Sequence, residues 1–186
     1  MKATEPVQVY LVRHPRPSNI DGLCYGRLEV AVEQQVLIDA ADSVFTHIPR
    51  RTLASALVCS SPSSRCLALA RHLAAPREPA SVEDLAEMNF GQWEGAAWDA
   101  IPRDQLDAWT ADVWGYQPGG GESANMVETR WLRWLDHARR MHIGTIVAVT
   151  HAGVIRVALA AAAGARRSTA LQTQIPFGSV HRLNLA

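Results

Sequence analysis

Two histidines that are candidates for catalytic residues follow short apolar runs of the sequence. Arg13 and His14 come directly after residues 7–12, and His151 comes shortly after residues 145–149. A neutral imidazole, with an ordinary pKa of about 6.5, carries a free lone pair for most of the time at neutral pH. His14 is therefore a candidate nucleophile, and His151 in its charged form is suited to hold an oxygen of a transferring group.

Arginines at positions 13 and 65 indicate an anionic substrate. The guanidinium group stays charged and donates two parallel hydrogen bonds to phosphate oxygens. Arg65 is expected in the first turn of a helix that follows residues 60–62, where free backbone N–H groups and the helix dipole also favour an anion. A phosphate monoester fits this set of groups.

A leaving alkoxide must take up a proton, which calls for a carboxylic acid whose surroundings favour its protonated form. Glu87 is flanked by the apolar residues Met88, Phe90 and Trp93. Glu94 is the other candidate in the same segment. Spacing alone does not choose between the two carboxyl groups.

The elements that must position these residues alternate between strands and helices. Short apolar runs predict strands at residues 7–12, 56–59, 145–149 and 180–185. The spacing of apolar residues predicts helices over about residues 31–47 and 154–163. A third helix is expected after residue 62, with Cys66, Leu69, Ala70 and Leu73 on one side. A fourth begins near residue 123, with Ser123 as its cap and with Trp131 and Trp134 in the core.

This order of elements implies an α/β sandwich with a mostly parallel sheet. Ligands in such folds collect at the carboxyl ends of the strands. Arg13, His14, Arg65 and His151 all fall at that edge, so three distant segments can share one pocket.

Composition fits one domain, residues 1–186, which is long enough to bury a core without disulfides or metals. Hydrophobic residues make up 48% and charged residues 19%, which excludes a disordered chain. Lys and Arg number 18, as do Asp and Glu, so the net charge favours neither nucleic acid nor an anionic membrane as a partner. No apolar stretch reaches the roughly 20 residues that span a bilayer. A homodimer is compatible with the sequence.

Cysteine usage favours a reducing compartment. Cys24, Cys59 and Cys66 are odd in number, and no secretory segment follows Met1, so we expect reduced thiols and a cytoplasmic location. Their spacing matches no zinc-binding pattern.

Five short segments, in order, together resemble the histidine phosphatase superfamily, also called phosphoglycerate mutase-like. The segments are Leu11-Val12-Arg13-His14 with Tyr25-Gly26-Arg27, Ser60-Ser61-Pro62 with Arg65, residues 87–95, Gly120-Gly121-Glu122-Ser123, and Thr150-His151-Ala152-Gly153-Val154-Ile155-Arg156. The match runs from about residue 7 to residue 156.

The resemblance implies a three-layer α/β/α sandwich, no metal or cofactor, and a phosphohistidine intermediate on His14. It also implies a role for each candidate residue. Phosphate would be held by Arg13, Arg65 and His151, a proton would be donated by Glu87, which later activates water, and the rim of the pocket would be formed by Tyr25, Gly26 and Arg27. Residues 13–17 with residues 22–27 are similar to the ribazole phosphatase branch, which is tied to cobalamin assembly.

Three positions depart from the family pattern. Pro15 stands where the family usually has Gly, and it lacks a backbone N–H but keeps a carbonyl that can accept from an imidazole ring. Arg16 stands where an acidic or polar residue is usual, so we expect a more cationic pocket mouth. Asn19 lies one position early relative to the family's Asn and is left out of the site.

Four functions compete at this stage. One of them, a protein phosphohistidine phosphatase, has no feature specific to a protein partner in its favour. The leading hypothesis is hydrolysis of a small phosphomonoester, with alpha-ribazole 5'-phosphate of cobalamin biosynthesis as the favoured substrate. A phosphoglycerate mutase would share the first step, but mutases of the family tend to carry an extra segment over the site. A phospholigand-binding protein without turnover is disfavoured by the retained reactive residues. Contact with the organic part of the substrate is expected from one of Trp93, Trp98, Trp109 and Trp114.

Overall fold

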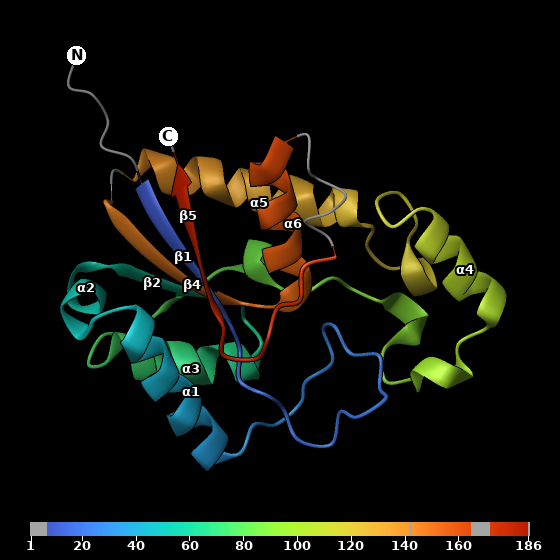
Figure 1. The fold of residues 1–186 in the computed structure, drawn as a ribbon, viewed down its shortest axis with the longest axis horizontal. Coiled ribbons are helices and arrows are strands. Elements are labelled where there is room, and N and C mark those ends of the chain that lie inside the picture. The colour runs from blue at the N-terminus through green and yellow to red at the C-terminus, as the bar shows by residue number, and fades with distance from the viewer. Residues whose placement is uncertain (1–6, 142, 165–171, 186) are drawn as a thin grey trace.

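A five-stranded sheet lies between two layers of helices in the computed structural model, which describes residues 7–141, 143–164 and 172–185 (Figure 1). The strands are β1 (Val7–Arg13), β2 (Leu57–Ser60), β3 (Ala80–Ser81), β4 (Thr145–Thr150) and β5 (Val180–Leu185), in the order β3–β2–β4–β1–β5. Strands β1 to β4 run parallel, and β5 pairs with β1 in the antiparallel sense. The predicted α/β/α sandwich with a mostly parallel sheet is confirmed.

The central position of β4 explains its composition. It pairs with β2 on one side and β1 on the other, and helices cover both faces, so every residue after Thr145 is buried. A strand in that environment must be a continuous apolar run rather than an alternating one. The sequence of residues 146–149 is such a run.

One helical layer consists of α5 (Ala124–Arg140) and α6 (Ala152–Ala163). Trp131 and Trp134 of α5 are buried in the core of this layer, as the sequence predicts. The Ser123 side chain accepts a hydrogen bond from the Met126 N–H at 3.4 Å, which confirms it as the N-cap. No helix in the described ranges is long and apolar enough to cross a membrane.

The opposite layer consists of α1 (Gln34–His47), α2 (Arg50–Ser55) and α3 (Ser64–Ala74). The four residues predicted to share one side of α3 are all buried against β2, β4 and α1: Cys66, Leu69, Ala70 and Leu73. The sequence did not predict α2, a six-residue helix with Leu53 as its one buried residue. Such a short helix has too few apolar positions to show a helical period.

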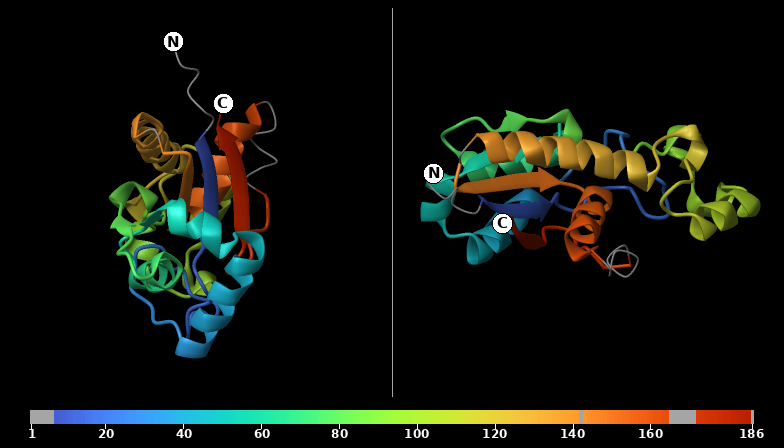
Figure 2. Two further views of the ribbon diagram at one scale, coloured as in Figure 1. Left: turned by 90° about the vertical axis from the view of Figure 1, so that its left-hand side faces the viewer. Right: turned by 90° about the horizontal axis from the view of Figure 1, so that it is seen from above.

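Helix α4 (Arg103–Ala111) lies in a lobe at one end of the molecule, away from the sheet (Figure 2). Four short 3-10 turns lie in the stretches that lead to and from it: η1 (Glu83–Leu85), η2 (Gly91–Trp93), η3 (Trp98–Ala100) and η4 (Pro118–Gly120). The core of the lobe contains Cys24, Trp93 and Ile101, with further aromatic rings around them. The sequence did not predict α4, a nine-residue, mostly polar helix in which no residue is fully buried.

Candidate active site

Backbone hydrogen bonds join the ends of three strands and bring the two histidines together. The His14 N–H donates to the Thr150 carbonyl at 3.0 Å, and the Ser61 N–H donates to the Val149 carbonyl at 2.9 Å. The His14 and His151 rings lie edge to face with centroids 5.1 Å apart. Segments from residues 14, 61 and 151 thus form one site at the carboxyl edge of the sheet.

The tautomer of His14 is set by the residue that follows it. Its Nδ1 lies 2.7 Å from the carbonyl oxygen of Pro15, which can only accept, so Nδ1 carries the proton. Nε2 is left with the free lone pair of a nucleophile. Burial, with smaller contributions from Arg65 and Arg13, lowers the pKa of His14 to about 3. The folded protein therefore holds a neutral imidazole here at physiological pH.

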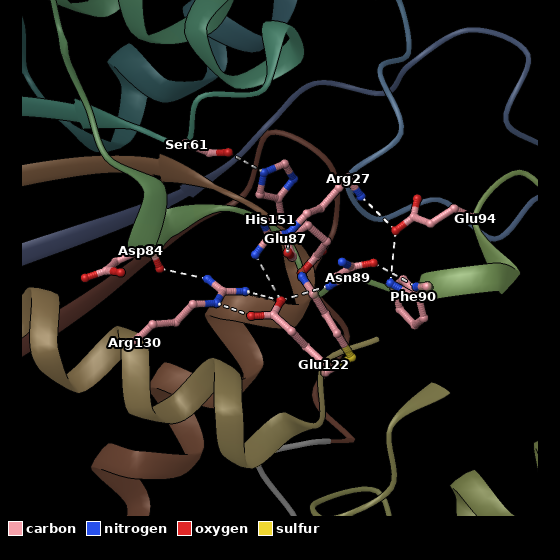
Figure 3. A network of polar contacts seen from close by, with 12 residues as sticks. Arg27, Ser61, Asp84, Glu87, Asn89, Phe90, Glu94, Glu122, Arg130 and His151 are labelled. Carbon is pink, nitrogen blue, oxygen red and sulfur yellow. Dashed lines mark hydrogen bonds and ion pairs between the residues drawn. The ribbon is translucent and has the colours of Figure 1, made fainter. Parts of the chain in front are cut away.

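The tautomer of His151 is the opposite one. Its Nδ1 lies 3.2 Å from Nη2 of Arg65, and a guanidinium has only donors, so Nδ1 must accept. The proton is then on Nε2, which lies 2.8 Å from Oγ of Ser61 and donates to it (Figure 3). Burial, followed by the nearby His14 and Arg65, holds the pKa of His151 well below its ordinary value. An anion that enters the site would favour the charged form of His151, because it opposes these cations.

Arg13 and Arg65 bring positive charge to the two imidazoles. Arg13 lies over the ring of Phe177 at 3.7 Å and donates to the Ile175 carbonyl, and burial lowers its pKa. Three of the five N–H donors of Arg65 are bound, to Gly26, Leu28 and His151. The Nε–H groups of both arginines are buried with no partner among the described residues. Unused buried donors are expected where an anion binds.

Tyr25 lies between the two arginines. Its hydroxyl forms a hydrogen bond with Arg13, and the Arg65 guanidinium lies 5.5 Å from the centre of its ring. Burial raises the pKa of Tyr25, so the hydroxyl stays protonated. Tyr25 therefore adds a neutral donor beside two cations.

The carboxylate of Glu87 lies against the first turn of α6. Its Oε2 accepts from the Gly153 N–H at 3.1 Å, and its Oε1 accepts from the Met88 N–H at 2.9 Å. A Cβ at position 153 would overlap Oε1, so glycine permits this approach. Glu87 lines the same cavity as His14, which is the place required of a proton donor to a leaving group.

Glu94 has a different environment. Its two oxygens accept from four backbone N–H groups, those of Gly26, Arg27, Leu28 and Phe90, at 2.9 to 3.0 Å. Burial would raise the pKa of Glu94, but these hydrogen bonds outweigh it and hold the pKa below its ordinary value. Glu94 does not line the His14 cavity. The geometry thus favours Glu87 over Glu94 as the acid, a choice that the sequence left open.

A cavity of about 400 Å³ opens beside His14. Charged and polar side chains in its lining include those of Arg13, Tyr25, Glu87 and Arg156. Most of the remaining lining residues are apolar: Leu23, Met88, Phe90, Trp98, Trp109, Val113 and Val157. Trp98 and Trp109 are stacked, with an interplanar angle of 5° and centroids 6.0 Å apart. Of the four tryptophans considered from the sequence, these two line the cavity, whereas Trp93 is buried and Trp114 packs on the core.

Arg27 and Arg16 lie outside this cavity. Arg27 and Gly26 line an adjoining hollow of about 170 Å³ together with Glu87 and His151, and Nη2 of Arg27 donates to Glu122 at 3.2 Å. Arg16 pairs with Asp21 at the surface. The expectation that Arg16 makes the mouth more cationic is therefore weakened, because its charge is compensated.

A buried ion pair supports the segment that carries Glu87. Arg130 donates to both oxygens of Glu122 at 3.1 and 3.2 Å and to the Asp84 carbonyl at 2.8 Å (Figure 3). Glu122 also accepts from the Asn89 N–H at 2.9 Å. Burial would raise the pKa of Glu122, but Arg130 and these bonds lower it. Residues on both sides of Glu87 are thus tied to helix α5.

Sequence reasoning missed several residues of the site. Ser61 was part of a quoted segment but received no role, and Phe177 lies in a stretch without a motif, 5.6 Å from the His14 ring between centroids. Arg156 lay in the last quoted segment, and only the structure places it at the cavity.

The thiols of Cys24, Cys59 and Cys66 are free and buried. Burial raises the pKa of all three, to about 12 for Cys24 and about 11 for Cys59. Within the described ranges, no group of three or more His, Cys, Asp or Glu side chains is placed to hold a metal ion.

Comparison with known proteins places this geometry in context. The model of the histidine phosphatase superfamily (branch 1) matches residues 9–186. No curated protein matches the chain. Many solved structures are similar to it, and three of them show the range of their activities. The alpha-ribazole phosphatase from Shigella flexneri has a TM-score of 0.79 and 23% identity, over 95% of this chain and 89% of that chain.

The second is the phosphoserine phosphatase from Entamoeba histolytica, a mutant in complex with phosphoserine, with a TM-score of 0.80 and 20% identity over 95% of this chain and 89% of that chain. The third is the phosphoglycerate mutase from Thermus thermophilus, with a TM-score of 0.71 and 25% identity over 97% of this chain and 99% of that chain. Three different activities on one fold mean that the fold does not select the substrate.

Burial of a neutral His14 makes stability depend on pH. Between pH 6.5 and about 3 the unfolded chain binds a proton on this residue that the folded chain does not. The free energy of unfolding therefore falls as the pH decreases through this window, by up to about 1.4 kcal/mol per pH unit for one group. We expect His14→Gln to reduce this slope, measured by urea unfolding from pH 4.5 to 6.5. The exposed His72→Gln should keep the slope of the unaltered protein, and an unchanged slope in His14→Gln would contradict the prediction.

Proposed function

The chain belongs to the histidine phosphatase superfamily, branch 1, and on that premise we propose that it hydrolyses a small phosphomonoester through a phosphohistidine on His14. The observation that carries the proposal is the pairing of the two imidazoles. A neutral His14 with a free Nε2 faces a neutral His151, with Arg65 bound to the latter and Arg13 beside the same cavity. A nucleophile surrounded by anion-binding groups is suited to phosphoryl transfer.

In the first step, Nε2 of His14 attacks phosphorus while the bond from phosphorus to the ester oxygen breaks. Arg13 and Arg65 hold the phosphoryl oxygens. His151 takes up a proton from the solvent as the anion binds, adds positive charge beside these oxygens, and loses the proton again when phosphate leaves. Glu87, as the carboxylic acid, gives its proton to the leaving oxygen. The products are an alcohol and a phosphorylated His14.

In the second step, a water molecule attacks the same phosphorus and gives its proton to the Glu87 carboxylate. The bond from phosphorus to Nε2 breaks, which releases inorganic phosphate and restores the neutral imidazole. Glu87 returns to its protonated form, so one group serves both steps.

Metal independence is part of the proposal. The charge that a divalent cation would bring to the phosphoryl oxygens can come from the guanidinium groups of Arg13 and Arg65, which hold planar pairs of donors. Both groups are held from behind, by Ile175 and Phe177 for Arg13 and by the Gly26 and Leu28 carbonyls for Arg65.

The shape of the cavity supports an alcohol with a flat apolar part. Phe90, Trp98 and Trp109 are among the residues that line it, and aromatic side chains pack favourably against planar rings. The Shigella flexneri protein of similar fold is an alpha-ribazole phosphatase. We therefore propose alpha-ribazole 5'-phosphate, in cobalamin biosynthesis, as the substrate.

Loss of the nucleophile should abolish turnover. The unaltered protein is expected to release phosphate from p-nitrophenyl phosphate in the presence of EDTA, and His14→Ala is expected to release none above background. Radiolabelled substrate, quenched in alkaline detergent that preserves phosphohistidine, should label His14 alone. His72→Ala is the matched control. A fully active, folded His14→Ala would refute the mechanism, and dependence on added metal would overturn metal independence.

Glu87→Gln should show which step needs its proton. For an alkyl phosphate we expect kcat/KM to fall by about 100-fold or more, the usual contribution of a general acid. For p-nitrophenyl phosphate, whose leaving group needs no proton, the fall in the phosphorylation step should be less than about 10-fold. Single-turnover rates of His14 phosphorylation measure this step. Equal losses with both substrates would contradict the assignment.

A panel of phosphorylated metabolites should rank the substrates. We expect the highest kcat/KM for alpha-ribazole 5'-phosphate, above phosphoserine and 3-phosphoglycerate, with phosphate release measured for each. Trp98→Ala should lower kcat/KM for the ribazole ester far more than for phosphoserine. Conversion of 3-phosphoglycerate to its 2-isomer without phosphate release would instead identify a mutase.

A further inference from the structure

Glu94 does not line the cavity beside His14. It binds the loop of residues 26–28, whose carbonyls in turn bind Arg65. We infer that Glu94 is a positioning residue, whose carboxylate fixes residues 26–28 so that their carbonyls hold the Arg65 guanidinium against His151. The inference rests on the proposed function and names a further residue on which its phosphate site depends.

Three successive backbone N–H groups converge on this carboxylate. Those of Gly26 and Leu28 donate to Oε2 at 2.9 and 3.0 Å. That of Arg27 donates to Oε1 at 2.9 Å (Figure 3). Oε1 also accepts from the Phe90 N–H at 3.0 Å. Within the part of the chain that the structure describes, Glu94 has no ion-pair partner, so its charge acts on these peptide groups.

The same residues of the loop present their carbonyls to Arg65. Nη1 of Arg65 donates to the Leu28 carbonyl at 2.9 Å, and Nη2 donates to the Gly26 carbonyl. Gly26 and Leu28 therefore bind an anion through their N–H groups and a cation through their carbonyls. The loop connects Glu94 to Arg65, and the second hydrogen of Nη2 faces Nδ1 of His151.

The loop itself buries little apolar surface. Arg27 and Leu28 are both exposed, Leu28 at 39%. Gly26 packs closely against the backbone of residue 88, because a Cβ at position 26 would overlap the Met88 carbonyl oxygen. A loop with so few apolar anchors depends on its hydrogen bonds, and the N–H groups of all three loop residues end on Glu94.

The consequence for the site is geometric. Arg65 is buried and its Nε–H has no described partner, so the loop carbonyls decide where its free donors point. Displacement of the loop would move the guanidinium relative to both the phosphoryl group and His151. A shift of about 1 Å in such a group can reduce the rate about 100-fold.

Glu94→Gln is the sharpest test, because glutamine keeps the shape but has one accepting oxygen. Its amide NH₂ would face either the N–H groups of Gly26 and Leu28 or those of Arg27 and Phe90. We expect kcat/KM to fall by about 10- to 100-fold, with the same factor for alkyl and aryl phosphates, and the inhibition constant of inorganic phosphate to rise. Glu78→Gln, at an exposed ion pair with Arg71, is the matched control and should leave both constants unchanged.

A double-mutant cycle tests whether Glu94 acts through Arg65. In an Arg65→Lys background the guanidinium that the loop positions is absent, so Glu94→Gln should lower kcat/KM by less than about twofold further. Additive losses would overturn the inference. Recovery of Glu94→Gln activity with the aryl ester would also overturn it, because that result would make Glu94 a proton donor.

Folding is monitored by circular dichroism and thermal unfolding. If Glu94→Gln does not fold, Glu94→Asp replaces it in the same assays, since its shorter side chain would pull the loop away from Arg65 while keeping the charge. Folded variants with unaltered kcat/KM and phosphate inhibition would refute the positioning role alone. Absence of phosphate release by the unaltered protein would instead refute the proposed function.

Discussion

The register of three parallel strands is the constraint on which the site depends. Strand β4 pairs with β1 so that Arg13 faces Thr150, and with β2 so that Ser60 faces Val149. Hydrogen bonds one residue further along then join His14 to Thr150 and Ser61 to Val149. Register in a sheet covered on both faces is strongly specified, because a slip by one residue would turn each side chain to the other face. The separation of the two imidazoles therefore follows from the packing of the whole sheet.

Most of the buried carboxylates near the site bind loops around the cavity rather than the cations that line it. The cavity beside His14 is lined by Arg13 and Arg156 with Glu87, and Arg65 lies behind it. Burial, with smaller contributions from Arg65 and Arg13, lowers the pKa of both imidazoles and keeps them neutral. The other acidic groups, Glu94 and Glu122, are bound by backbone N–H groups and by Arg130, where they hold loops in place. Buried charges in this arrangement are each paired or hydrogen-bonded, as their desolvation requires.

The division of the chain into a sandwich and a lobe separates two tasks. The sheet edge supplies His14, Ser61 and His151, which the proposed function assigns to the phosphoryl group. The lobe with α4 supplies Trp98 and Trp109, which the same proposal assigns to the organic part of the substrate. Loops and lobes can change without disturbing the sheet. Proteins of the same fold carry different activities, so the residues outside the sheet are where differences in substrate are expected.

The order of the main strands and helices, the parallel sheet and the edge at which His14 and His151 lie could all be predicted from the amino-acid sequence. This was possible because apolar periodicity and strand-end position are local properties of the chain. Helices α2 and α4 escaped prediction because they are short, with six and nine residues, and carry few apolar positions. Only the tertiary structure distinguished Glu87 from Glu94, since both lie in one segment and differ in which backbone groups approach them from elsewhere. The same holds for Ser61, Phe177 and Arg156, whose roles depend on contacts across many residues of sequence, and such contacts are fixed by packing rather than by spacing.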